Sequence, residues 1–504
     1  MRRVLLVCLA VSLAVAATAA PSLVLVGGKV FTADPAKPWA EAIAIEGNRI
    51  SAVGSNAEVR ALAGTDTRVI DLGGRVVIPG INDAHMHPGF AAPAFRIDLG
   101  MDPSWAQLSA ALAAASDETS ADTWISAIAG PTVLLDPAVN NEKLDAVTHG
   151  RKVRLEGFTG HGIILSSAAM KALGLADDAR DPEGGWYGRT ATGKLDGRAN
   201  EYAQYPLDNR FSELASDEDL LDDIRTLNTN ALGFGVTSVQ AMPGVTAKRF
   251  ASAVRTAGVP LRIRTIHFFG DVGAAGRGEP VKWILDGTPI ERNAAVRKPY
   301  PAGGTGRENF SDLTRIVKSA IEGDHPLLLH AAGDKAVESA LKAFAKYPGL
   351  KRPRIEHGDG LHRDLLAAAK KSGVVIVQNP THFMARQLYP PGDYMMGETI
   401  VRAGIPYAFG SDGAMNPFLD IQLATNRTDN PSESLTREQA VTAYTRGSAY
   451  AEFKENEKGT LAKGMLADLA VLSQDLFQVP AAAMADTRSV LTIIDGKVVM
   501  SQLP

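Results

Sequence analysis

Short apolar runs separated by glycine-rich turns dominate both ends of the chain. Residues 22–79 alternate apolar stretches with Gly and Asn, and the segments 467–473 and 489–501 follow the same pattern. Such strands, spaced at roughly ten residues, are typical of a small antiparallel sheet. We therefore expect residues 20–79 and 460–504 to form one β-sandwich subdomain built from the two termini.

Between these ends, β-branched runs alternate with helical stretches, which is the order that βα units around a parallel sheet produce. The helical stretches include 311–323, 334–346, 361–372 and 436–451. The candidate strands are 76–85, 235–240, 261–268, 281–286, 326–330, 353–357, 374–378 and 406–411. We therefore expect residues 80–459 to form an α/β fold of the (β/α)₈ TIM-barrel type. The stretch 101–232 is too long for one crossover, so it is expected to form an inserted lobe above the barrel mouth.

The first twenty residues have a different layout. Two arginines precede an apolar run over residues 4–17, which ends in the small-residue pattern Ala17-Thr18-Ala19. This layout predicts a secretory signal peptide over residues 1–19, because the run is shorter than the roughly 20 apolar residues that a membrane span needs. We expect an exported protein, periplasmic or secreted, with no stable membrane anchor once the signal is removed.

Composition restricts the classes of function. The 504 residues carry 52 Lys and Arg against 56 Asp and Glu, a net charge of −4, and no basic run. This balance gives no electrostatic footprint for nucleic acid and favours a small-molecule partner, while a homo-oligomer stays open. The chain has ten His and a single Cys. Any metal site must therefore use mainly imidazole and carboxylate ligands.

The strongest chemical signal is the run VVIPGINDAHMH, in which a predicted strand ends with His85 and His87. Residues two apart on a strand point to the same face, so both imidazoles can reach one metal ion. The alternative is a pair of polar histidines in a solvated loop. By itself the His-x-His pattern does not separate these two readings.

Three more residues of ligand type stand where predicted strands finish. His330 ends HPLLLH, His357 ends RIEH and Asp412 ends AFGSD. Because the carboxyl ends of barrel strands meet at one face, these side chains are expected to lie near the histidine pair of the first strand. Any one of them alone would be read as a core histidine or a structural acid. His382, which follows QNP, could also face the mouth.

Several segments resemble the successive motifs of a known family. In chain order they are VIPGINDAHMHPGF, VKWILDG, HAAGDKAVESAL, RIEHGDG, GSDGAMNP and AYTRGSAYAEFKENEKGTLAKGMLADLAVL. They are similar to those of the amidohydrolase superfamily, in its YtcJ-like branch, which includes N-substituted formamide deformylase. The resemblance extends from about residue 22 to the C-terminus.

The resemblance implies a division of labour among the strand-end residues. His85 and His87 would bind the more buried metal, and His330 and His357 the more exposed one. Asp412 would bind the buried metal and act as the general base toward a metal-bound hydroxide. The resemblance thus implies two divalent cations, for which zinc is expected, with manganese, iron and cobalt as alternatives.

Lys282, within VKWILDG, falls where the family places a lysine that takes up carbon dioxide. The resulting carbamate would bridge the two metals. A free ammonium beside two cations would be repelled, whereas a carbamate is an anionic oxygen ligand. Spacing alone would favour a salt-bridging lysine.

Two further residues are carried over from the resemblance as substrate contacts. The segment 157–175 resembles a family motif in which Asp-Gly-His leads into a helix, but Thr159 replaces the acid. His161 is expected to be a catalytic and substrate-binding residue that donates a hydrogen bond to the substrate carbonyl; the alternative is a loop histidine. Arg292, after LDGTPIE, is expected to bind substrate, and surface salt bridging is the alternative.

Taken together, these residues predict a metal-dependent amidohydrolase. It would hydrolyse a non-peptide C–N bond of an amide-type substrate through a metal-activated hydroxide. A mononuclear deaminase or cyclic-amide hydrolase on the same barrel is the alternative within the enzyme class. A catalytically silent binding protein is disfavoured because all six candidate ligand positions are present.

Overall fold

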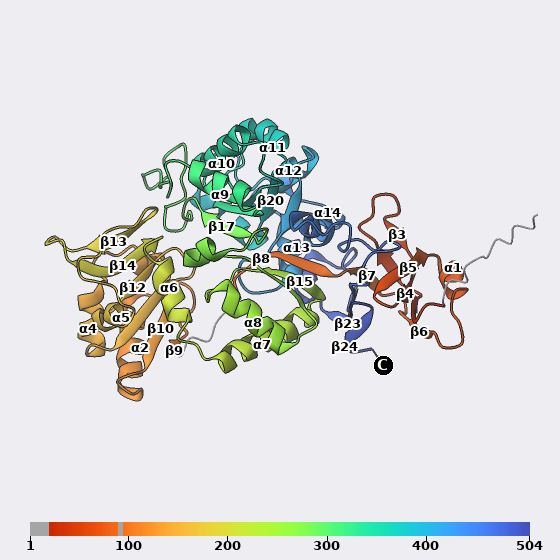
Figure 1. Cartoon of the computed structure of the whole chain (residues 1–504), viewed down its shortest axis with the longest axis horizontal. Helices are drawn as coiled ribbons and strands as arrows, with labels where there is room; N and C mark the ends of the chain where they lie inside the picture. The colour runs from red at the N-terminus through yellow and green to blue at the C-terminus, as the bar shows by residue number, and fades with distance from the viewer. Residues whose placement is uncertain (1–19, 89–93, 504) are drawn as a thin grey trace, which may run out of the picture.

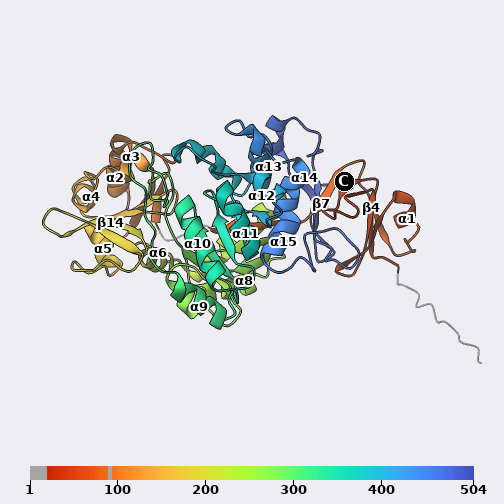
Figure 2. The ribbon, with the colours of Figure 1, turned by 90° about the horizontal axis from the view of Figure 1, so that it is seen from above.

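The computed structural model describes residues 20–88 and 94–503. The molecule is elongated, with an inserted lobe, a central barrel and a terminal sandwich following one another along its long axis (Figures 1 and 2). The predicted signal segment 1–19 lies outside the described residues. Within the part of the chain that the structure describes, no helix has the length and apolarity needed to span a bilayer.

Eight strands form the barrel. They are β8 (Ile81–Met86), β15 (Val236–Ala241), β16 (Arg262–Thr265), β17 (Val281–Ile284), β18 (Leu327–Ala331), β19 (Arg354–His357), β20 (Val375–Gln378) and β21 (Tyr407–Phe409). They pair in parallel as two sheets, β16-β15-β8 and β17-β18-β19-β20-β21. A parallel bridge between His267 and Val281 joins the sheets at one seam, and the Asp412 N–H donates to the His85 carbonyl at the other. The expected (β/α)₈ barrel is confirmed.

Helices cover the outside of the barrel. They are α7 (Asp217–Gly233), α8 (Ala247–Ala257), α9 (Thr314–Glu322), α10 (Asp334–Lys346), α11 (Leu366–Ser372), α12 (Gly397–Arg402), α13 (Pro417–Thr425), α14 (Arg437–Thr442) and α15 (Ser448–Ala451). A π-helical turn, η5 (Ala443–Gly447), joins the last two. In α10 the buried side chains of Val337, Leu341 and Phe344 recur at helical spacing, which turns one apolar face toward the sheet.

Both termini build the β-sandwich. One sheet has the order β5-β4-β1-β6, and the other has the order β24-β23-β22-β7-β2-β3. The N-terminal strands are β1 (Leu23–Val26), β2 (Lys29–Phe31), β3 (Trp39–Ala40), β4 (Ala42–Glu46), β5 (Arg49–Gly54), β6 (Arg68–Asp71) and β7 (Val76–Pro79); the C-terminal strands are β22 (Leu469–Leu472), β23 (Ser489–Ile494) and β24 (Lys497–Ser501). The side chains of Leu25, Ile43, Val77, Leu469 and Ile493 share the core between the two sheets.

Gly80 divides the segment that the sequence predicts as one strand over residues 76–85. Before it, β7 pairs with β22 and β2 in the sandwich; after it, β8 pairs with β15 in the barrel. A Cβ atom on Gly80 would lie 2.2 Å from Oγ1 of Thr237. The chain can therefore change sheets here only because residue 80 has no side chain.

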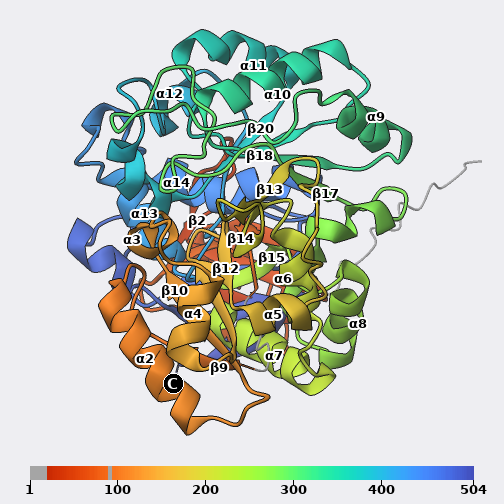
Figure 3. The same cartoon turned by 90° about the vertical axis from the view of Figure 1, so that its left-hand side faces the viewer.

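The inserted lobe covers the carboxyl ends of the barrel strands (Figure 3). Its sheet has the order β13-β14-β12-β11-β10-β9. Its strands are β9 (Ala94–Ile97), β10 (Trp124–Ala129), β11 (Lys152–Gly157), β12 (Ile163–Leu165), β13 (Gly185–Arg189) and β14 (Leu195–Glu201), and its helices are α2 (Trp105–Glu118), α3 (Pro131–Leu134), α4 (Asn141–Thr148), α5 (Ser167–Ala172) and α6 (Tyr205–Ser212).

The lobe differs from the expected range 101–232 at both ends. Its edge strand β9 begins at residue 94, and α7 packs on the barrel instead of the lobe. Leu220 and Ile224 of α7 share a buried cluster with Ala241 of β15 and Phe250 of α8. These apolar side chains recur at helical spacing and fit the barrel wall, so α7 serves as the crossover helix that leads into β15.

Candidate metal centre and active site

The end of β8 presents two imidazoles, each of which is oriented through its Nδ1 atom. The Nδ1 of His85 lies 2.6 Å from a carboxylate oxygen of Glu356, and the Nδ1 of His87 lies 3.2 Å from the carbonyl of Met242. With Nδ1 occupied on each ring, both Nε2 atoms can serve as ligands. This arrangement, a ligating nitrogen on one side and an orienting acceptor on the other, is the one that metal-binding histidines generally use.

Asp412 completes a cluster of three ligand atoms with this pair. It stands shortly after the end of β21, its φ of 43° is left-handed, and its N–H donates to the His85 carbonyl. Its Oδ1 lies 3.4 Å from the Nε2 of His85 and 3.6 Å from the Nε2 of His87. Burial opposes ionisation of Asp412, but His85 and neighbouring hydrogen bonds hold its pKa well below its usual range.

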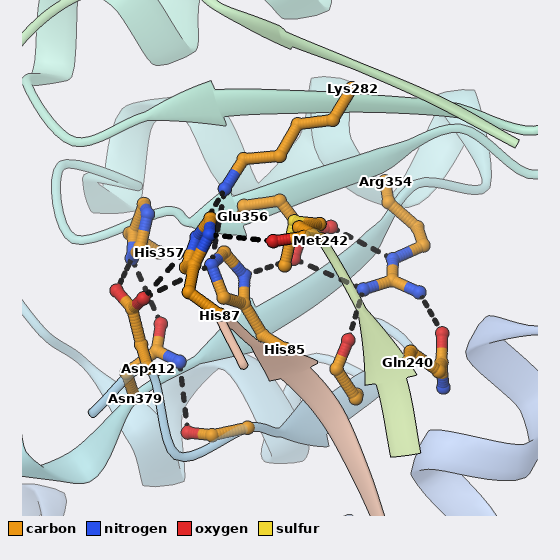
Figure 4. Close-up of polar contacts among 12 residues, drawn as sticks. His85, His87, Gln240, Met242, Lys282, Arg354, Glu356, His357, Asn379 and Asp412 are labelled. Carbon is orange, nitrogen blue, oxygen red and sulfur yellow. Dashed lines mark hydrogen bonds and ion pairs between the residues drawn. The ribbon is translucent and has the colours of Figure 1, made fainter. Parts of the chain in front are cut away.

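The side chain of Lys282 extends from β17 into the same cluster (Figure 4). Its Nζ lies 3.1 Å from the Nε2 of His85 and 3.4 Å from the Nε2 of His87. It also lies 4.8 Å from the ring centre of Phe268. Burial lowers the pKa of Lys282 to about 8, so a substantial fraction of the amine is neutral near pH 7.5.

A second group of ligand atoms forms on the other side of Asp412. It consists of His357, His382 and Asp412, whose ligand atoms lie within 4.8 Å of one another. The Nδ1 of His357 lies 2.8 Å from Oδ1 of Asn379, and the amide of Asn379 donates to the Gly410 carbonyl. The Nε2 of His382 lies 3.3 Å from Oδ2 of Asp412, and its ring stacks on that of His357.

His330 lies beside this second group without being one of its converging ligands. Its ring centre is 4.3 Å from that of His357 and 4.8 Å from that of His161. Its Nε2 faces the Gly287 carbonyl at 3.4 Å and a carboxylate oxygen of Asp286 at 3.6 Å. Burial, with the neighbouring charge of His161, holds the pKa of His330 well below its usual range. The imidazole is therefore neutral, and its Nδ1 can offer a lone pair to a metal ion.

A buried ion pair between Arg354 and Glu356 holds the ring of His85 in place. The guanidinium of Arg354 donates to both oxygens of Glu356, at 2.8 and 3.0 Å, and also to the Ala84 carbonyl at 2.8 Å and to the Gln240 side chain. Burial opposes ionisation of Glu356, but Arg354 and His85 together lower its pKa to about 2. The carboxylate that orients His85 is therefore charged and fixed on two sides (Figure 4).

These donor sets fit divalent cations. Two imidazole nitrogens and a carboxylate oxygen converge in each of the two groups, and Asp412 belongs to both. Imidazole and carboxylate ligands suit zinc as well as manganese, iron and cobalt. The described residues therefore offer places for two ions on either side of one shared carboxylate.

The lobe contributes a histidine to the mouth of the barrel. His161 lies between β11 and β12, and its Nδ1 is 2.9 Å from Oε1 of Glu201. The other oxygen of Glu201 accepts hydrogen bonds from the Tyr205 hydroxyl and the Asn309 amide. Burial disfavours the charged imidazolium, but the carboxylate of Glu201 raises the pKa of His161 above its usual value. The sequence identified His161 but not Glu201.

The comparisons with known proteins can now be set beside this geometry. The model of a family described as the amidohydrolase family matches residues 68–500. The chain belongs to the amidohydrolase family. It is therefore a hydrolase that acts on carbon–nitrogen bonds other than peptide bonds.

Curated relatives confirm the YtcJ-like branch. The YtcJ protein of Bacillus subtilis (strain 168), described as a candidate amidohydrolase, is 26% identical over 94% of this chain and 98% of its own length. The N-substituted formamide deformylase of Arthrobacter pascens is 24% identical over 94% of this chain and 97% of its own. Among solved structures, a metal-dependent hydrolase from Pyrococcus horikoshii OT3 has a TM-score of 0.71 at 19% identity, covering 92% of this chain and 99% of its own. That last likeness supports the fold.

Two residues that the sequence of this amidohydrolase singles out, Thr159 and Arg292, have different surroundings. Thr159, which stands where the family has an acid, hydrogen-bonds a carboxylate oxygen of Glu291, and Thr288 holds the other oxygen. Glu291 thus places a buried carboxylate beside Thr159, the position at which the family motif has an acid. The side chain of Arg292 is exposed, and among the described residues it makes no hydrogen bond or ion pair. Its role as a substrate contact stays a prediction.

Proposed function

We propose that this amidohydrolase hydrolyses a small, non-peptide amide with the help of two divalent cations, for which zinc is the first candidate. The observation that carries the proposal is the convergence of His85, His87 and Asp412 around the Nζ of Lys282. Three neutral or anionic donors do not gather around a buried amine without a chemical reason, because such a cluster is costly to desolvate.

The two groups of ligands divide the work of holding the cations. His85, His87 and Asp412 would hold the more buried ion. His357 would hold the outer ion together with His330, the residue expected from the sequence, or with His382. When bound, divalent cations lower the pKa of water and polarise the scissile carbonyl.

Lys282 is suited to carry a carboxylated side chain between the two ions. With a pKa of about 8, its amine can add to carbon dioxide, forming a nitrogen–carbon bond and releasing one proton. The amine nitrogen already lies between His85 and His87, so the carbamate oxygens formed on it would lie within the ligand cluster. The product is an anionic oxygen donor in place of a cation.

Asp412 is the proposed proton carrier. Its carboxylate is held ionised and belongs to both ligand groups, so one oxygen can accept the proton of the attacking water. The same oxygen can then deliver that proton to the leaving nitrogen. His161, oriented by Glu201, is placed to donate an N–H to the carbonyl oxygen as negative charge develops there.

The substrate class follows from the reaction and from the relatives. An N-acyl or N-formyl amine presents a carbonyl for polarisation and a nitrogen for protonation, and one relative is named as a deformylase of N-substituted formamides. We therefore propose small N-acyl, N-formyl or cyclic amides. The lobe, which covers the mouth, would select among them (Figure 3).

The test is a screen of such amides with zinc-loaded protein, scored for released amine, alongside metal analysis and the variants His85→Ala and Asp412→Ala. A matched control is Asp393→Ala, which removes a surface carboxylate from a loop outside the metal centre. Full activity in metal-free protein would overturn the proposal. One metal per chain with an unmodified Lys282 would instead support the mononuclear deaminase or cyclic-amide hydrolase.

Export is a further part of the proposal. The layout of residues 1–19 supports cleavage after Ala19 and a periplasmic or secreted mature protein. Amino-terminal sequencing of the protein from its native host should begin at Ala20. A chain that keeps Met1 and stays in the cytoplasm would contradict this assignment.

A further inference from the structure

A cavity opens at the end of the barrel opposite the metal centre. It has a volume of about 330 Å³ and lies where the chain enters β17, β18 and β19. Its lining includes Arg264, Ile321, His325, Leu350, Lys351 and Phe453. Because the ligand residues stand at the other ends of the same strands, the length of the barrel separates this cavity from the active site.

Arg264 is the unusual residue of this cavity. The parallel register of β15 and β16 sets it beside Gln240, whose side chain contacts Arg354 inside the barrel, so Arg264 also points inward. Within residues 20–88 and 94–503, its guanidinium makes no hydrogen bond or ion pair, and its Nη1 is buried without an acceptor. Burial lowers the pKa of Arg264 to about 10. A buried guanidinium N–H without an acceptor is rare because its desolvation is costly.

The charges around Arg264 leave one positive charge without a counterpart. Arg354 is paired with Glu356, and Lys458 lies 2.7 Å from Oε1 of Glu452. Glu452, Arg354 and Glu356 are the charged groups that act on Arg264, and each of the two carboxylates already has a cation of its own. Three cations therefore face two anions, and the missing partner is a single negative charge.

The cavity wall indicates the shape of that partner. Ile321, Leu350 and Phe453 offer apolar surface, and at the rim Lys351 is already paired with Asp324 at 3.0 Å. A group with one negative end and an apolar body would match both features. Glu452 lies in the same wall and would repel a second negative charge, which disfavours phosphate and sulfate.

We propose that this cavity binds a small organic carboxylate, whose charged end pairs with Arg264 and whose apolar body lies against Ile321, Leu350 and Phe453. The planar guanidinium can meet a carboxylate through two parallel N–H bonds. The site is independent of the proposed catalytic function, because none of its residues reaches the metal ligands.

The experiment locates the carboxylate directly. Crystals of the metal-loaded protein soaked in 4-bromobenzoate are expected to show the anomalous signal of bromine in the cavity beside Arg264. A carboxylate product can also bind at the metal centre, and the position of the bromine separates the two sites. Bromine at the metal centre alone, or at neither place, would overturn the proposal.

Calorimetric titration with sodium butyrate supplies a second measurement. Arg264→Gln is expected to weaken the binding to this site by roughly tenfold or more, as loss of a charged hydrogen-bonding partner does. Arg255→Gln, which changes an exposed arginine on α8, should leave it unchanged. Chloride and n-butanol are expected not to compete; competition by chloride at the affinity of butyrate would overturn the carboxylate assignment. If Arg264→Gln does not fold, the crystallographic result on the unaltered protein decides.

Discussion

The side-chain nitrogen of Lys282 lies 3.1 Å from the Nε2 of His85, inside the space where the ligand atoms of β8 and β21 converge. At this distance the two nitrogens share one hydrogen bond. A metal ion bound to the Nε2 of His85 would take the place of that hydrogen bond. The contact also gives Lys282 a testable role.

Lys282→Ala should lower kcat/KM by about two orders of magnitude or more, because an anionic ligand shared by two cations is lost. Addition of a short carboxylic acid such as propionate should restore part of the activity by supplying the missing oxygens. Lys298→Ala, on the surface, serves as the control. An alanine variant with normal activity and normal metal content would contradict the carbamate.

Glu356→Gln should weaken metal binding by about 10- to 100-fold, because His85 loses the charged acceptor that orients it. It should also destabilise the protein by about 3–5 kcal/mol, since Arg354 is left buried without its counter-charge. Metal titration and chemical denaturation measure the two effects separately. Glu218→Gln, an exposed change on α7, should alter neither.

His382→Asn and His330→Asn distinguish the two candidates for the outer ion. The geometry favours His382, whose Nε2 lies 3.3 Å from Asp412, over His330, whose Nε2 faces Gly287. We expect His382→Asn to reduce the bound metal toward one ion per chain, measured by elemental analysis. Loss of an ion from the His330 variant alone would restore the assignment made from the sequence.

Glu201→Gln should lower kcat by about 10- to 100-fold while the metal content stays constant, because His161 loses the carboxylate that orients and charges it. Substrate affinity should change less than turnover. Tyr205→Phe, which removes one of the hydrogen bonds to Glu201, should have a smaller effect in the same direction. Equal losses of metal and activity would show that Glu201 has a structural role only.

Gly80→Ala should destabilise the fold by about 1–3 kcal/mol, because its new methyl group would overlap the side chain of Thr237. Thermal unfolding measures the effect, and the second substitution Thr237→Ala should recover part of it. Gly273→Ala is the contrasting glycine change, because Gly273 does not have a left-handed φ and no atom lies within 4 Å of its added Cβ. An unchanged melting temperature for Gly80→Ala would show that the junction can relax.

The barrel and the ends of its strands could be predicted because their signals are local. A β-branched run that ends in His or Asp marks both a strand and the place where its side chain emerges, as at His85, His357 and Asp412. Residues two apart on β8 necessarily share a face. The strand order and the meeting of these residues then follow from the fold class.

Other features depend on packing that no short segment encodes. His382 lies in the irregular helix η3 (Pro380–Leu388), so its approach to Asp412 depends on how that turn folds over the mouth. Glu201 reaches the site only because the lobe lies over the barrel. The lobe also ends before α7 and not at residue 232, because the apolar face of α7 packs on the barrel wall. The sequence of α7 alone does not show which surface that face will contact.

The pairing of Pro79 with Leu469 has a consequence for how the chain folds. The sheet β24-β23-β22-β7-β2-β3 joins β7, made early in synthesis, to β22, made almost last, so it stays incomplete until nearly the whole polypeptide is available. Contacts of such long sequence separation form slowly and leave a strand edge exposed in the meantime. Without the last strands, the first ones would lack their pairing partners. A C-terminally truncated chain should therefore aggregate and not fold into a shorter enzyme.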